Sequence, residues 1–303
     1  MKSPPFAIAT LLLLSACAPA LAGTPIDERR AVNADARIDI SNVRGAVTIS
    51  TWDQPEVAIS GTLGDGSKGL RVDGGGARLS IKVEPPERSG WGWFNWGSSS
   101  RMDDSILDIR LPRQAELKLA VVSAEVTISG SEGRLVEVSS VSGRVRIEGS
   151  AREIKVGSVS GSIDLANSGE RVQVETVSGE ARLRGAASRL KFESVSGSIQ
   201  IEADGYAEVE ASSVSGDIGI GGGAAAGARV DAETLSGDVR VRVPAAYSAR
   251  IRAESFSGRI RSDFGTVKEP ERGPGRSLET TTGSGDARLN IETFSGDIEI
   301  RRE

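Results

Sequence analysis

A short motif recurs along most of the chain: a hydrophobic residue, Ser and Gly, followed by a polar position and then an apolar one. Its glycines are Gly143, Gly161, Gly179, Gly197, Gly216, Gly237, Gly258 and Gly296. Successive glycines are 18, 18, 18, 19, 21, 21 and 38 residues apart. Val122-Ser123-Ala124 is a degenerate copy 19 residues before Gly143, and Val43-Arg44-Gly45 is an earlier outlier. A nearly constant period of this length indicates a repeat architecture.

Alignment of the repeats on the glycine shows where the apolar positions lie. They stand seven and five residues before the glycine and two and four residues after it, so each half-repeat alternates with period two. This alternation predicts strands with one buried face. In one such strand we expect Leu190 and Phe192 to point inward and Lys191 and Glu193 to point outward.

The middle of each repeat breaks this alternation. A small hydroxyl residue stands three positions before the glycine, and an apolar residue stands two positions before it. The apolar positions therefore change parity, which a regular strand cannot do, so we expect the chain to bend there. The glycine that follows tolerates a positive φ, which suits a corner.

Two short strands and two corners in about 18 to 21 residues form one coil of a parallel β-solenoid, or β-helix. Eight or nine coils at a strand spacing of about 4.8 Å would form a rod of roughly 40 Å. The alternative fold is an antiparallel β-sandwich, which also has short strands at regular spacing. The solenoid is favoured because identical residue types recur at every second strand, as in-register stacking requires.

The ends of the chain depart from the repeat. Residues 70–72 and 77–83, joined by Gly74-Gly75-Gly76, predict an antiparallel hairpin. Residues 278–282 and 287–293 predict a second one. Hairpins near both ends would help to cover the exposed strand edges of a solenoid. The sequence pattern thus divides the mature chain into an N-terminal β region with a Trp-rich loop (23–114), the β-solenoid repeats (115–262), and a loop, hairpin and last coil (263–303).

The N-terminus has the pattern of an export signal. Lys2 precedes an apolar run over residues 6–14, which suits a signal peptide but is shorter than the roughly 20 residues that a membrane span needs. Leu14-Ser15-Ala16-Cys17 resembles a lipoprotein cleavage site, with a signal of residues 1–16 and lipidation at Cys17. Cleavage after Ala20-Leu21-Ala22 would instead remove residues 1–22. We expect an exported protein: a periplasmic or outer-membrane lipoprotein, or alternatively a secreted or soluble periplasmic protein.

Composition excludes several classes of function. The 303 residues carry a net charge of −5, so no basic excess suggests nucleic-acid binding. The chain has no histidine and one cysteine, which excludes His-dependent catalytic triads and intramolecular disulfides. The Ser-Gly-Asp turns lack the Gly-Gly-x-Gly-x-Asp spacing of calcium-binding β-rolls, so we predict no metal site and no cofactor.

Three copies of the motif read Val-Ser-Gly-Asp-Ile or a close variant: Val214-Ser215-Gly216-Asp217-Ile218, Leu235-Ser236-Gly237-Asp238-Val239 and Phe294-Ser295-Gly296-Asp297-Ile298. Through these copies the chain, over roughly residues 24–303, resembles a family of bacterial envelope proteins with β-strand repeats, a domain of unknown function often labelled "putative adhesin". The resemblance implies a repeat β fold at the cell envelope and no catalytic residues.

One segment stands out from the repeats because it contains three of the four tryptophans among glycines and serines. Its aromatic rings could stack on sugars, contact a membrane interface, or pack as a lid over the solenoid. Two aspartates that follow could accept hydrogen bonds from glycan hydroxyls. The candidate ligand loop consists of Trp91, Trp93, Phe94, Trp96, Asp103 and Asp104.

The sequence therefore predicts a non-enzymatic envelope protein, adhesin-like or a scaffold, that presents a rigid repeat surface to an envelope protein or a glycan. An envelope-stress regulatory or ligand-sensing protein is the alternative. A carbohydrate-active enzyme is less favoured because the coils are minimal and gather no acids and bases on one face.

Overall fold

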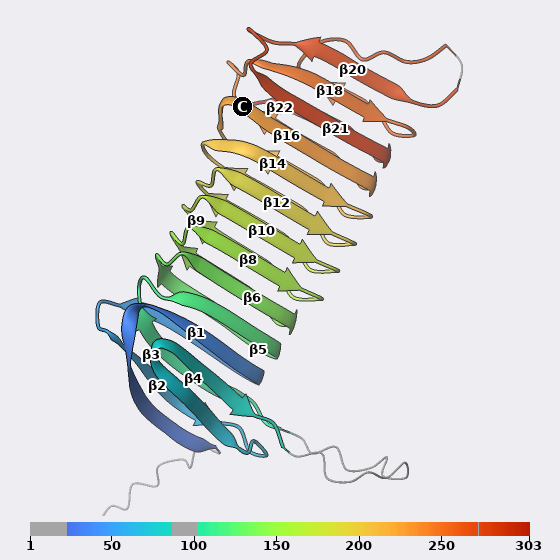
Figure 1. Ribbon diagram of the computed structural model, residues 1–303. Coiled ribbons are helices and arrows are strands. Elements are labelled where there is room, and N and C mark those ends of the chain that lie inside the picture. The colour runs from blue at the N-terminus through green and yellow to red at the C-terminus, as the bar shows by residue number, and fades with distance from the viewer. Residues whose placement is uncertain (1–22, 87–101, 272) are drawn as a thin grey trace, which may run out of the picture.

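The computed structural model describes residues 23–86, 102–271 and 273–303, and shows a rod of stacked coils (Figure 1). All of its 22 regular elements are β-strands. Nearly all neighbouring strands pair in parallel; the antiparallel pairs between named strands are β1–β2, β2–β4 and β18–β20. The predicted parallel β-solenoid is confirmed, and this pairing excludes the antiparallel sandwich.

Each coil contributes one strand to each of two faces, which enclose the core between them. The first face contains the strands before the motif glycine, in stacking order β6 (Leu135–Ser142), β8 (Glu153–Ser158), β10 (Arg171–Thr176), β12 (Arg189–Ser194), β14 (Tyr206–Ser213), β16 (Ala224–Ser236), β21 (Ala287–Ser295), β18 (Ala249–Ser255) and β20 (Arg276–Thr281). The second face contains the strands after it, β7 (Val145–Gly149), β9 (Ile163–Asn167), β11 (Ala181–Gly185), β13 (Ile199–Ala203), β15 (Ile218–Gly221), β17 (Val239–Val243), β22 (Ile298–Arg302) and β19 (Ile260–Ser262).

The core follows the predicted alternation. Leu190 and Phe192 are each 1% exposed, whereas Lys191 and Glu193 face outward. Leu190 lies between Val172 and Val209 of the neighbouring coils, in register. Side chains of the same type thus stack on one another along the rod, which explains why the same residue types recur once per coil.

The coils at the C-terminal end are not stacked in chain order. The last coil, β21 and β22, lies between the coil of β16 and β17 and the coil of β18 and β19 (Figure 1). Ile291 of β21 accordingly pairs with Ala232 on one side and Ala253 on the other. The expectation that each coil stacks on the preceding one is wrong here. The reason is that every coil presents the same two edges, so the final coil fits between two others as well as beyond them.

The N-terminal end has the same arrangement. β1 (Thr24–Trp52) and β5 (Glu116–Ser131) each run through both faces, and β1 lies between β5 and an outer coil formed by β3 (Gly69–Glu84) and β4 (Ser105–Pro112). β2 (Glu56–Leu63) pairs antiparallel with β4 and with the start of β1. Strand pairing is therefore continuous from the predicted N-terminal region into the repeats and on to the C-terminus.

The two predicted hairpins have different outcomes. The first lies within β3, where the chain folds back on itself: Lys68 N–H donates to the Glu84 carbonyl at 2.9 Å, and Arg71 pairs with the Glu84 carboxylate at 2.8 Å. The second prediction is wrong, since β20 and β21 lie on opposite sides of β18. β20 alone covers the outer edge of β18, antiparallel to it.

The motif glycines form one column along the rod, but their role differs from the predicted one. Apart from Gly143, with φ of +112°, none of the eight has a positive φ. What they share is close approach: a Cβ added at Gly161 would lie 1.8 Å from the carbonyl oxygen of Gly143. Glycine is therefore required by backbone contact between coils. Ala124 occupies this column only in β5, where the strand continues through the corner.

The serine and aspartate of the motif tie adjacent coils together. Ser160 Oγ donates to the Val141 carbonyl of the preceding coil at 3.2 Å. The same bond to a neighbouring coil is made by Ser142, Ser178, Ser196, Ser215 and Ser257. Asp238 N–H donates to Asp217 Oδ1, and Asp297 N–H donates to Asp238 Oδ1, both at 2.9 Å. Arg259 continues the series, and its N–H and guanidinium lower the pKa of the Asp297 carboxyl. These carboxylates accept hydrogen bonds from backbone N–H groups, which explains the Asp of the motif without a metal.

Candidate binding groove

A row of large apolar side chains lies on the outside of the solenoid. It is formed by the residue two positions before each of the eight motif glycines, and before Ala124 of the degenerate copy, and every member is 46–55% exposed. We call this row the apolar ladder. In stacking order it consists of Val122, Val141, Val159, Val177, Val195, Val214, Leu235, Phe294 and Phe256. Contiguous exposed apolar surface is typical of interaction sites, so the apolar ladder is a candidate binding surface.

The ladder faces outward because the neighbouring hydroxyl residue turns inward. Ser194 is buried, and its Oγ accepts the Gly197 N–H at 2.8 Å and donates to the Gly197 carbonyl. Ser213 and Ser255 accept the N–H of their own motif glycines in the same way. A buried N–H needs a partner, so the hydroxyl occupies the inside of the corner. The chain then turns, and the next residue is left in solvent.

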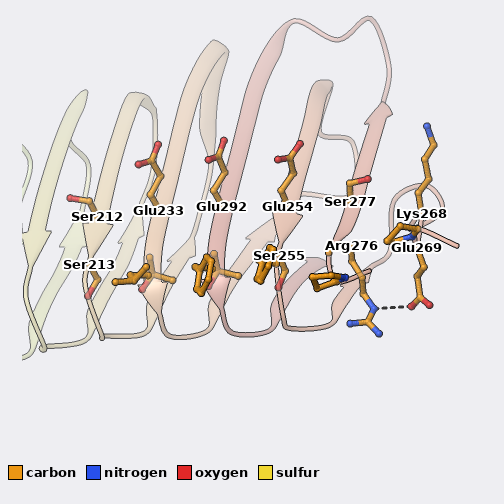
Figure 2. Close-up of a pocket in the computed structure, with 18 residues that line it drawn as sticks. Ser212, Ser213, Glu233, Glu254, Ser255, Lys268, Glu269, Arg276, Ser277 and Glu292 are labelled. Carbon is orange, nitrogen blue, oxygen red and sulfur yellow. Dashed lines mark hydrogen bonds and ion pairs between the residues drawn. The ribbon is translucent and has the colours of Figure 1, made fainter. Parts of the chain in front are cut away.

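A row of carboxylates runs parallel to the ladder on the first face. We call it the glutamate row; it consists of Glu175, Glu193, Glu233, Glu292 and Glu254, with Ser212 interrupting it. The glutamate row stands four positions before the glycine, two residues before the ladder. Figure 2 shows Glu233, Glu292 and Glu254 side by side on successive strands with their carboxylates pointing the same way.

Between the two rows lies a groove, which is widest at the C-terminal end. This C-terminal groove has a volume of about 830 Å³. Leu235, Phe294 and Phe256 form one side, and the rings of Phe256 and Phe294 stack with centroids 4.7 Å apart and planes at 8°. The loop containing Pro270 and Pro274 closes the end. A second hollow of smaller volume, about 470 Å³, lies along Val159, Val177 and Val195.

The charges around the C-terminal groove are unevenly neutralised. Glu254 pairs with Arg252 at 2.8 Å, and Arg276 pairs with Glu269 at 2.8 Å in the closing loop (Figure 2). Glu233 and Glu292 form no salt bridge with any residue in the described part of the chain; Glu292 accepts only an amide hydrogen bond from Asn290 at 3.2 Å. Among the described residues these two carboxylates have no salt-bridge partner; Arg252, whose pKa is raised chiefly by its hydrogen bond to Glu254, also attracts Glu292 electrostatically.

None of the predicted site residues that the structure describes lies in this groove. Trp91, Trp93, Phe94 and Trp96, like Cys17, fall outside the described residues. Asp103 and Asp104 lie at the opposite, N-terminal end of the rod. The Asp104 carboxylate pairs with Arg44 at 2.5 Å, and Asp103 N–H donates to the Asp65 carbonyl. The sequence pattern did not reveal this groove. The change of parity in each repeat indicates a bend, but it does not show whether the hydroxyl residue or the apolar residue after it faces solvent.

The sequence matches the family described as Toastrack DUF4097 over residues 35–301. The chain belongs to this family. The Toastrack match includes both inserted end coils, and it confirms the resemblance to a domain family of unknown function. No match was found among curated proteins.

Three solved structures resemble this Toastrack protein. A putative lipid binding protein from Parabacteroides distasonis ATCC 8503 has 16% identity and a TM-score of 0.53, covering 93% of this chain and 99% of that one. A putative adhesin from Bacteroides fragilis NCTC 9343 has 13% identity and a TM-score of 0.40, covering 92% and 97%. A putative cell adhesion protein from Clostridium sporogenes ATCC 15579 has 13% identity and a TM-score of 0.27, covering 92% and 100%. At these identities the similarity bears on the fold alone.

Within residues 23–86, 102–271 and 273–303, no cluster of three or more His, Cys, Asp or Glu side chains is placed to hold a metal ion. In the same part of the chain there is no helix of the length and hydropathy needed to cross a bilayer.

Proposed function

We propose that this protein is a non-enzymatic component of the cell envelope, an adhesin-like or scaffold protein that binds its partner through the apolar ladder. The observation that supports the proposal most directly is the ladder itself. Nine side chains, each about half exposed, are held in register along the rod. Leaving such a surface in water has no structural benefit, whereas covering it with a partner contributes about 25 cal/mol per Å² buried.

The rigidity of the ladder favours a binding role. The Ser–carbonyl bonds and the buried hydroxyls hold the backbone at the corners where they form, as at Ser160 and Ser194, so the ladder residues there are preorganised. Because this surface is already ordered, binding of a partner costs little conformational entropy, which improves affinity.

Replacement of Val159, Val177 and Val195 by Ser is expected to abolish most binding of the purified protein to isolated envelope fractions, as measured by co-sedimentation. These side chains are exposed, so the melting temperature should change little. The matched control replaces Arg146 and Arg184, which face outward on the second face, by Ser. Equal sedimentation of wild type and the valine variant would show that the ladder is not the binding surface.

We also propose that Cys17 is lipidated and tethers the rod to a membrane. Expressed in a bacterium fed labelled palmitate, the wild type should incorporate label and partition into detergent, and Cys17→Ala should lose both properties. The lipobox-like Leu14-Ser15-Ala16-Cys17 supports this proposal. A mature N-terminus at Gly23 would contradict it and would indicate ordinary signal cleavage.

A second candidate function is binding of a lipid. The Parabacteroides neighbour is named a putative lipid binding protein, and the apolar ladder would suit acyl chains. The glutamate row beside the ladder is unfavourable for an anionic bilayer because like charges repel. A protein partner is therefore the better fit to this surface.

A further inference from the structure

We propose that the C-terminal groove binds a basic amphipathic α-helix that lies along the axis of the rod, with its apolar face on the ladder and its basic flank against the glutamate row. This proposal deepens the proposed binding function by naming the chemistry of the partner. It concerns the widest part of the groove, between Leu235 and the loop of Pro270 and Pro274.

The apolar wall changes character at this end. Six successive rungs are valine, whereas the last three are Leu235, Phe294 and Phe256. The two stacked phenyl rings give a broad, stiff surface at the centre of the groove. Large aromatic side chains in a concave, preorganised site are typical anchors of protein interfaces.

The charge of the groove selects a cationic partner. Its lining contains four carboxylates, those of Glu233, Glu254, Glu269 and Glu292, against the two cations Lys268 and Arg276. Glu254 and Glu269 form salt bridges, whereas Glu233 and Glu292 form none with any described residue. A Lys or Arg placed beside the ladder would satisfy these two carboxylates, which face solvent on adjacent strands.

The spacing of the ladder favours a helix over an extended peptide. Rungs repeat at about 4.8 Å along the rod, the spacing of hydrogen-bonded strands. Side chains on one face of a helix repeat at about 5.4 Å per turn, so three turns meet three rungs with little drift. Same-face side chains of an extended chain repeat at about 6.8 Å and lose register by the second rung.

Hydrogen bonding points the same way. The strands on both sides of the groove are already paired, and the hydroxyls of Ser213, Ser255, Thr234 and Thr293 on its floor are bonded to the glycine turns. Between β16 and β18 an extended peptide would find no free strand edge to join, since each of these strands is paired on both sides. A helix satisfies its own backbone groups and needs only an apolar surface and charges, as in other helix-in-groove complexes.

The test uses the purified protein and a fluorescein-labelled 18-residue peptide of Leu and Lys, with Leu at helical spacing on one face. We expect saturable binding by fluorescence anisotropy that weakens with added salt. A scrambled peptide of the same composition and a Glu-for-Lys peptide should bind at least about tenfold more weakly, because each removes one half of the complementarity.

Variants locate the site. Glu233→Gln with Glu292→Gln should weaken peptide binding about three- to tenfold and reduce its salt dependence, because two exposed charge pairs are removed. Phe256→Ser with Phe294→Ser should weaken it about thirtyfold or more. The charge-matched control, Glu125→Gln with Glu148→Gln, removes two outward carboxylates of the second face and should leave binding unchanged.

Several outcomes would overturn the proposal. The first is an equal loss of peptide affinity in the Glu233/Glu292 variant and in its Glu125/Glu148 control. The second is equal affinity for the scrambled and the amphipathic peptide. The third is binding to phosphatidylcholine vesicles that depends on Phe256 and Phe294 and is stronger than binding to the peptide. The valine variant of the ladder, changed at Val159, Val177 and Val195, should still bind the peptide. The binding of this valine variant to envelope fractions therefore tests the proposed function of the ladder independently of the proposed helix-binding site.

Discussion

Gly161→Ala is expected to destabilise the protein by about 3 kcal/mol or more, whereas Gly157→Ala in the same coil should be neutral or slightly stabilising. The Cβ added at position 161 would meet the carbonyl oxygen of Gly143 at 1.8 Å, and a backbone atom cannot move aside without separating two coils. A Cβ at position 157 meets nothing within 4 Å. Alanine there reduces the entropy of the unfolded chain.

The two free energies of unfolding can be measured by urea denaturation followed by circular dichroism. Neither glycine has a positive φ, so the comparison isolates close approach from backbone strain. Similar stability of the two variants would mean that the coils can separate at the glycine column, and that the contact is not the reason for the glycine.

A disulfide between cysteines at positions 231 and 290 is expected to form readily and to stabilise the protein by about 4 kcal/mol. Asp231 and Asn290 are direct neighbours on β16 and β21, and both face outward. Adjacent strands lie about 4.8 Å apart, which suits a disulfide. The bond would close a loop of roughly 60 residues, for which chain-entropy models give a stabilisation of this size.

The matched control places the cysteines at Asp231 and Arg252. Both residues pair with Asn290, from opposite sides, so two strand spacings of about 9.6 Å separate them and no disulfide should form. Cross-linking is read from gel mobility and free-thiol titration, in a chain that also has Cys17 replaced by Ala. If the coils were instead stacked in chain order, cysteines at positions 231 and 252 would form the disulfide and those at positions 231 and 290 would not.

The hydrogen bonds of the motif aspartates are consistent with the position of the last coil between its two neighbours. The Asp238 N–H donates to the Asp217 carboxylate, the Asp297 N–H to Asp238, and the Arg259 N–H to Asp297. With the last coil inserted, the Asp297 N–H donates to the Asp238 carboxylate. The Asp297 carboxylate in turn accepts the Arg259 N–H and forms a salt bridge with the Arg259 guanidinium at 2.7 Å. Placed at the end of the rod, the same Asp297 carboxylate would lack the coil that supplies Arg259.

The sequence by itself determined the repeat, the parallel stacking and the core. Leu190 and Phe192 are buried as their alternation predicts, because a strand has only two faces and one of them must exclude water. The glycine column was also evident, although its cause was not. Whether a glycine serves a positive φ or a close contact depends on a neighbouring coil, and the local pattern does not contain that neighbour.

Only the tertiary structure decided the order of the coils and the position of the groove. Coils with equivalent edges can stack in several orders, and the repeat pattern is the same in all of them, so the insertion of β21 and β22 between their neighbours has no local signal. The apolar ladder was visible as a column of Val, Leu and Phe, but apolar character alone suggests burial. Its exposure follows from the corner, where the hydroxyl of Ser194 and its equivalents must face inward to satisfy the glycine N–H. The rings of Phe256 and Phe294 stack because β18 and β21 are neighbouring strands, and the insertion of the last coil places Phe294 between Leu235 and Phe256.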